Sequence, residues 1–99
     1  MKVQVVSQTG VGTADPIVIN TNVSPVNVGF AVIVTGTVEY TIMRSYDDPS
    51  NLVNYFADAN ITNKTASDEY SYTTPFTALV LNVTSGTGTA TMSVVQAGI

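Results

Sequence analysis

The chain lacks both cysteine and histidine, and these two absences exclude much of the common chemistry of active sites. Without cysteine there are no disulfides and no thiolate ligands for a metal. Without histidine, the commonest general base and zinc ligand is missing, and so is every Ser-His-Asp or Cys-His arrangement. We therefore expect no enzyme activity, no metal and no cofactor.

Basic residues are scarce as well. Lys2, Arg44 and Lys64 stand against seven acidic residues, and the formal net charge is -4. Nucleic acids and anionic membranes are poor candidate partners, because affinity for phosphate groups comes from Lys and Arg. Charged residues make up only 10% of the chain. A surface polar through hydroxyls and amides loses little solvation when it meets another protein, although an ordinary Thr-rich β surface has the same composition.

Long apolar runs are also missing. No stretch approaches the roughly 20 apolar residues that span a bilayer. The first ten residues, "MKVQVVSQTG", contain only a short apolar run, unlike a signal peptide, so we expect a protein made in the cytoplasm. At 99 residues, residues 1–99 are expected to form a single domain, because single cores are built from about 50 to 200 residues.

The sequence is rich in two-residue alternation, which is typical of strands. In "VNVGFAVIV", residues 26–34, valines and Phe30 fall on one face, and the other face is small and partly apolar. "TVEYTIM", residues 37–43, resumes the pattern after Thr35-Gly36. A tight turn there predicts an antiparallel hairpin.

A second pair of alternating runs closes the chain. "FTALVLNV" and "TATMSVVQ" flank the segment Ser85-Gly86-Thr87-Gly88-Thr89. Glycines two apart suggest a phosphate loop, but such loops lead into a helix, whereas a strand pattern without lysine follows here. We therefore interpret the segment as the corner of a hairpin at the edge of the fold.

Shorter strands are expected at residues 3–7, 16–20 and 70–73, and all four prolines lie at segment boundaries. Residues 48–58 differ, because their apolar positions are spaced more like a helix. We expect one short helical turn or loop there, crossing between sheets with its aromatic residues over the open end of the core. The fold class predicted is all-β: an antiparallel β-sandwich resembling a jelly roll.

Acidic residues form one constellation, made of Asp47, Asp48, Asp58, Asp68 and Glu69. Paired carboxylates can hydrolyse glycosides or hold calcium. The chain leaves little room for a substrate cleft, however, and the spacing matches no calcium loop. We expect Asp47 and Asp48 to cap the turn that follows them, through its backbone N–H groups.

Arg44 is the single arginine, and arginine beside aromatic residues is enriched at protein interfaces. An ion pair with a neighbouring aspartate is the alternative. Tyrosines near it suit a contact surface, since their rings are apolar and their tips polar. The residues predicted as an interface are Arg44, Tyr46, Asp47, Asp48, Tyr55 and Phe56.

Two segments carry a family resemblance: "VTGTVEYTIMRSYDDP" and "YTTPFTALVLNVTSGTGTATMSVVQAG". They resemble small structural proteins of tailed bacteriophages, in which a strand leads to a D-D-P turn and a terminal hairpin contains L-N-V-T-S-G-T-G. The likeness covers roughly residues 16–98. It implies a virion component, similar to the capsid cement or decoration proteins that clamp the head.

The resemblance implies a non-enzymatic role on the capsid exterior, after assembly in the host bacterial cytoplasm. The major capsid protein is the expected partner, bound over subunit junctions by a dimer or trimer of this chain. An adaptor of the neck or tail, or a module that attaches fibres, is the alternative. A carbohydrate-binding module is a further alternative, for which Tyr46, Asp47, Asp48 and Tyr55 would supply the contacts.

Overall fold

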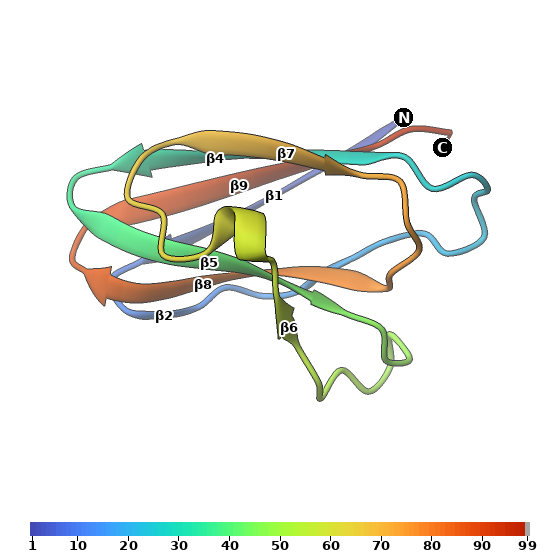
Figure 1. Cartoon of the computed structure of the whole chain (residues 1–99), viewed down its shortest axis with the longest axis horizontal. Coiled ribbons are helices and arrows are strands. Elements are labelled where there is room, and N and C mark those ends of the chain that lie inside the picture. The colour runs from blue at the N-terminus through green and yellow to red at the C-terminus, as the bar shows by residue number, and fades with distance from the viewer. Residues whose placement is uncertain (99) are drawn as a thin grey trace.

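A computed structural model describes residues 1–98, which form two facing antiparallel sheets and one short 3-10 turn (Figure 1). The first sheet has the order β1 (Lys2–Thr9), β9 (Thr89–Gln96), β4 (Val28–Thr35) and β7 (Asp68–Tyr72). The second has the order β2 (Gly12–Thr13), β8 (Ala78–Gly86), β5 (Val38–Ser45) and β6 (Phe56–Ala57), and β3 (Ile17–Val18) also pairs with β8. The predicted all-β sandwich is confirmed.

The strand order is that of a jelly roll. The first half of the chain pairs with the second half in nested order: β1 with β9, β2 and β3 with β8, β4 with β7, and β5 with β6. The chain thus doubles back at the loop between β5 and β6. The resulting double ribbon is rolled up, so that β9 also meets β4 and β8 also meets β5. The short β2 and β3 share one of the eight strand positions of this fold.

The core lies between the sheets and follows the predicted alternation. Each of the four long central strands turns every second side chain inward, and burial of each such side chain contributes about 1.5–3 kcal/mol. The inward side chains are Val28, Phe30, Val32, Val38, Tyr40, Ile42, Leu79, Leu81, Val83, Ala90, Met92 and Val94, all of them buried.

Both predicted hairpins are wrong. β4 and β5 follow one another across Gly36-Thr37 but belong to different sheets, and the same holds for β8 and β9 across Thr87-Gly88. β8 and β9 are moreover central strands, not an edge. The alternation fixes which side chains face the core. It does not fix whether two successive strands pair edge to edge or face each other across that core.

The crossing turns meet at one end of the sandwich, on the left of Figure 1, where the backbones touch. Gly88 N donates to Thr37 O at 2.8 Å, and Gly10 N donates to Gly88 O at 3.0 Å. A Cβ on Gly88 would lie 2.4 Å from Thr35 O, closer than any side chain tolerates. The glycine-rich segment is therefore a corner, as predicted, but its glycine allows three backbones to approach each other.

The loop near residues 48–58 is present, and the short helical turn η1 (Ala59–Ile61) follows β6 directly. The predicted crossing within this loop is wrong, because β5 and β6 pair in one sheet. Tyr55 and Phe56 are exposed and do not cover the core. β6 is a two-residue edge strand, and the side chains of both its residues are exposed. Ile61 of η1 is buried against the core instead.

We expect Gly88→Ala to lower the free energy of unfolding by about 2 kcal/mol or more, because the added methyl group overlaps the backbone of a neighbouring turn. Urea denaturation measures the change. Gly29→Ala is the matched control, since its Cβ would meet no atom within 4 Å, and its effect should stay within about 0.5 kcal/mol. Equal effects of the two substitutions would contradict the contact between turns.

Candidate functional site

The six residues predicted as an interface lie along one stretch, from the end of β5 to β6. Arg44 and Phe56 are partners in the β5–β6 ladder. The Tyr46 ring packs edge-on against Phe56, with 5.8 Å between the ring centroids. Both rings are more than half exposed. The structure thus brings Arg44, Tyr46 and Phe56 together, while Asp47, Asp48 and Tyr55 lie in the loop between the strands.

The predicted capping role of the two aspartates is confirmed. Asp47 Oδ2 accepts hydrogen bonds from the backbone N–H groups of Asn54, at 2.6 Å, and Val53, at 2.8 Å. Asp48 Oδ1 accepts from both the backbone N–H and the hydroxyl of Ser50. These bonds, above all those from the backbone, hold the pKa of each carboxyl below its ordinary value. Both carboxylates are therefore occupied in shaping the loop.

Arg44 does not form the alternative ion pair with a neighbouring aspartate. Within residues 1–98, the ion pair found joins Lys64 to Asp68 at 3.4 Å. The Arg44 guanidinium lies instead over the ring of Tyr72, 4.7 Å from its centroid, which is a cation–π geometry. Its Nε is buried and has no hydrogen-bond partner among the described residues.

Asp58 lies beside this pair and is 4% exposed. Its Oδ1 accepts hydrogen bonds from the backbone N–H of Asn60, at 2.9 Å, and from Asn60 Nδ2, at 3.2 Å. The Tyr72 hydroxyl donates to Oδ2. Burial raises the pKa of Asp58, but Tyr72, Asn60 and the Arg44 charge together lower it below 3.8. Burial and Asp58 raise the pKa of Tyr72, so its hydroxyl remains a donor.

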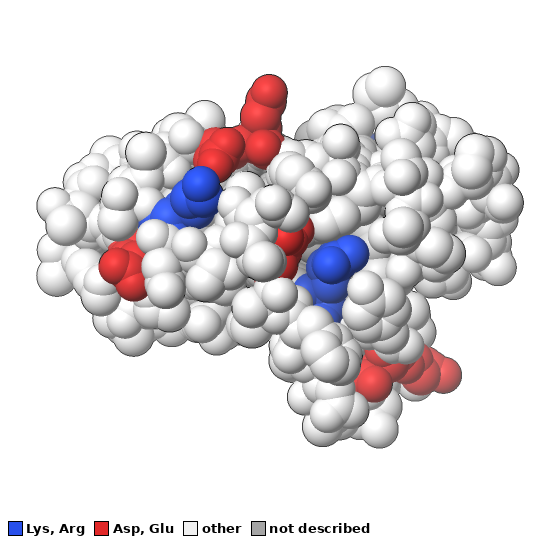
Figure 2. All heavy atoms as spheres, in the orientation of Figure 1, with Lys and Arg blue, Asp and Glu red and all other residues white. Residues whose placement is uncertain are grey.

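These groups line a polar pocket of about 210 Å³. It lies at the edge of the sandwich that faces the viewer in Figures 1 and 2, where β5 of one sheet and β7 of the other come together. Of these residues only Arg44 was in the predicted interface, and Asp58 was predicted only as part of the acidic constellation. The others lie in two further segments, residues 58–60 and 70–74, which the sequence alone does not link to Arg44. The residues of this pocket, which we call the Arg44 pocket, are Arg44, Asp58, Asn60, Tyr70, Ser71, Tyr72, Thr73 and Thr74.

A second candidate surface is the outer face of the first sheet, formed by the side chains that alternate with the buried ones. Glu69 is its only charged residue, and Val5 and Ile33 are 57% and 58% exposed. Sequence reasoning noted the small, partly apolar side of β4 but not the surface that it joins. The outer face consists of Val3, Val5, Ser7, Thr9, Gly29, Ala31, Ile33, Thr35, Glu69, Ser71, Thr89, Thr91, Ser93 and Val95.

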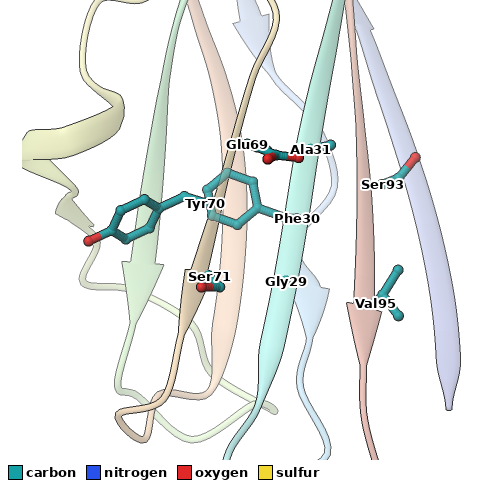
Figure 3. Close-up of a pocket in the computed structure, with 8 residues that line it drawn as sticks. All are labelled: Gly29, Phe30, Ala31, Glu69, Tyr70, Ser71, Ser93 and Val95. Atoms are coloured by element: carbon teal, nitrogen blue, oxygen red, sulfur yellow. The ribbon is translucent and has the colours of Figure 1, made fainter.

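The outer face has two distinct parts. In one part, Gly29 and Ala31 of β4 lie beside Ser93 and Val95 of β9, at a shallow depression of about 490 Å³ that Glu69, Tyr70 and Ser71 also line (Figure 3). In the other part, nearer the crossing turns, two cross-strand pairs of hydroxyls are hydrogen-bonded at 2.9 Å: Ser7 with Thr91, and Thr9 with Thr89. Small side chains and already bonded hydroxyls make this face inexpensive to desolvate.

No protein-family model, curated protein or solved structure matches the chain. Among residues 1–98, no group of three or more acidic side chains is placed to hold a metal ion. No helix in the described part of the chain is long and apolar enough to cross a membrane. The outer face and the Arg44 pocket are therefore interpreted from their own geometry.

We expect Tyr72→Phe to lower the free energy of unfolding at pH 7 by about 1.5–3 kcal/mol, the contribution of a hydrogen bond to a charged group. The pKa of folded Asp58 lies below 3.8, so its stabilisation is present above about pH 4 and is lost as the pH falls through the folded value. The difference between the two proteins should therefore shrink as the pH falls below about 4 and through the folded pKa. Urea denaturation at pH 7 and at a series of lower pH values measures it.

Tyr70→Phe is the control for this experiment. The Tyr70 hydroxyl meets Asn60 Nδ2 at 3.2 Å, but the residue is 40% exposed and has no contact with the Asp58 carboxylate in the described structure. Removal of the Tyr70 hydroxyl should change stability by no more than about 0.5 kcal/mol at any of these pH values. A Tyr72→Phe effect that persists unchanged once Asp58 is protonated would show that the hydroxyl does not act on the ionised carboxylate.

Proposed function

We propose that the protein is a structural component of a tailed-bacteriophage virion, a cement or decoration protein that binds the major capsid protein over subunit junctions. The observation that carries the proposal is the outer face, a broad β surface with one charged residue and exposed apolar side chains. The resemblance of residues 16–98 to small virion proteins supports the same role. The low proportion of charged residues in the chain, 10%, also agrees with a role in binding another protein.

The outer face suits a protein partner for a physical reason. The centres of protein interfaces are poor in charged residues, because an unpaired charge is costly to remove from water. Val3, Val5 and Ile33 are each more than half exposed and so have apolar area to bury. Each hydroxyl pair beside them has one internal hydrogen bond, which leaves a single O–H donor per pair for a partner. A flat, weakly charged capsid surface would complement such a face.

Multivalency supplies the strength of binding in this proposal. A dimer or trimer of the chain would contact several capsid subunits at once, and linked contacts raise retention well above that of one face alone. Binding would also stabilise this small domain by mass action. In the alternative role, as a neck or tail adaptor, the same face would bind at far fewer places on the particle.

We expect Val5→Lys and Ile33→Lys each to weaken binding to capsids by about 10-fold or more, because each places an unpaired charge in the buried interface. The measurement is cosedimentation of the purified protein with expanded heads assembled without it. Val11→Lys is the control, since Val11 is 68% exposed in the turn after β1 and lies outside the outer face.

Two results would overturn the proposal. One is wild-type protein that neither sediments with the heads nor raises their resistance to heat. The other is loss of binding in Val11→Lys equal to that in the two outer-face variants. Circular dichroism of each variant separates loss of binding from loss of fold.

Copy number separates the two virion roles. We expect many copies per particle, in proportion to the capsid subunits, because subunit junctions recur over the whole head. Densitometry of purified virions on gels, calibrated with the major capsid protein, measures the ratio. A few copies per particle would instead favour the neck or tail position.

A further inference from the structure

The Arg44 pocket contains a cation whose bonding is incomplete. The guanidinium stacks on Tyr72, yet Nε has no hydrogen-bond partner, and no carboxylate of residues 1–98 lies within ion-pair distance. A guanidinium offers five donors in a planar fork that matches a carboxylate. Contact with the Tyr72 ring, 4.7 Å from its centroid, holds the guanidinium in place before any ligand arrives. An arginine held in this way is organised to receive an anionic oxygen pair.

Asp58 narrows the kind of anion that fits. Its two oxygens are held by Tyr72 and Asn60, so it stays in the pocket as a fixed negative charge. A phosphate, a sulfate or an acidic peptide side chain offers only acceptors to this carboxylate and would be repelled by it. A ligand that has both a carboxylate and hydroxyl groups fits better. Its carboxylate can bind Arg44, and its hydroxyls can donate hydrogen bonds to Asp58.

The remaining lining suits a sugar ring. Thr73 and Thr74 line the pocket with further polar groups, and Ser71 lies at the boundary between the pocket and the outer face. Tyr70 is 40% exposed, and Asn60 Nδ2 bonds its hydroxyl at 3.2 Å, which positions an aromatic ring at the rim. The volume of about 210 Å³ is below the roughly 300–1,000 Å³ typical of pockets for drug-sized ligands. The pocket therefore has room for a single ring, with the rest of a glycan outside it.

We propose that the Arg44 pocket binds one acidic sugar residue of a glycan, with the sugar carboxylate on Arg44 and its hydroxyls on Asp58 and Asn60. This activity is separate from capsid binding by the outer face. It also differs from the carbohydrate site suggested by the sequence, since Asp47, Asp48 and Tyr55 lie in the loop between β5 and β6 and do not line this pocket. The site would give a virion protein a second kind of partner, acidic polysaccharides, bound at an edge of the sandwich.

The test compares glucuronate with glucose, which differ only in the carboxylate. We expect calorimetric titration of the full chain to detect glucuronate, with a Kd of about 1 mM or below, and at least 10-fold weaker binding of glucose. Arg44→Gln should weaken glucuronate binding by about 10-fold or more, because it removes a charge-assisted contact. Lys64→Gln, which removes the same charge outside the pocket lining, should have no effect.

Arg44→Lys and Thr74→Val keep the test decisive if Arg44→Gln fails to fold. The lysine keeps the charge but loses the planar fork, so binding should be intermediate. Thr74→Val preserves the side-chain shape and removes one polar group of the lining, so binding should weaken without loss of thermal stability. Unchanged glucuronate binding in folded Arg44→Lys and Thr74→Val would overturn the proposal.

Three further outcomes would also overturn it. These are equal binding of glucose and glucuronate, no binding of glucuronate, galacturonate or N-acetylneuraminate to the folded protein, and binding of an aspartate-rich peptide in place of the sugars. Cosedimentation of Arg44→Gln with phage heads keeps the two proposals distinct. That variant should bind heads like the wild type, so either function can fail without the other.

Discussion

Backbone contact between the crossing turns is the constraint on which the rest of the structure depends. The Gly88 carbonyl accepts a hydrogen bond from Gly10 N–H, and the Gly88 N–H donates to the Thr37 carbonyl. The three turns that lead from one sheet to the other are therefore hydrogen-bonded together at one end of the sandwich. Each crossing sends the chain to the opposite sheet after a strand. Every strand except β6 then has a partner far along the sequence, and the nested pairing of a jelly roll follows. Both candidate surfaces consequently combine residues that are distant in the chain.

At the exposed edge between β5 and β7, polar bonding replaces apolar packing. Asp58 is fixed by Tyr72 and Asn60, and Tyr72 in turn supports the Arg44 guanidinium. The group joins β5, η1 and β7, so it ties the two sheets together at that edge. It also leaves the buried Nε of Arg44 without a partner among the described residues. The same cluster thus serves the stability of the sandwich and prepares a site for a ligand.

The outer face shows how a chain with few charges can still carry a defined contact surface. Two pairs of its hydroxyls are hydrogen-bonded across strands, as in Ser7 with Thr91, so part of the hydrogen bonding that these groups need is already made within the face. Because Gly29 and Ala31 have little or no side chain, the face has a shallow depression at these residues, where another surface can approach the backbone closely. Charged side chains gather in small groups on the edge seen in Figure 2, and the surface around them is uncharged.

The sequence by itself determined the class of fold and the side of each strand that is buried. Alternation in residues 26–34 and 76–83 predicted the inward Val28, Phe30 and Leu81 correctly, because the two-residue period belongs to the geometry of a single strand. The capping by Asp47 and Asp48 could also be predicted, because each side chain bonds backbone N–H groups within a few residues of itself. Only the tertiary structure decided that β4 and β5 face each other instead of pairing, and that Arg44 meets Tyr72 and Asp58. A two-residue turn allows either arrangement, and the choice rests on contacts between segments far apart in the chain.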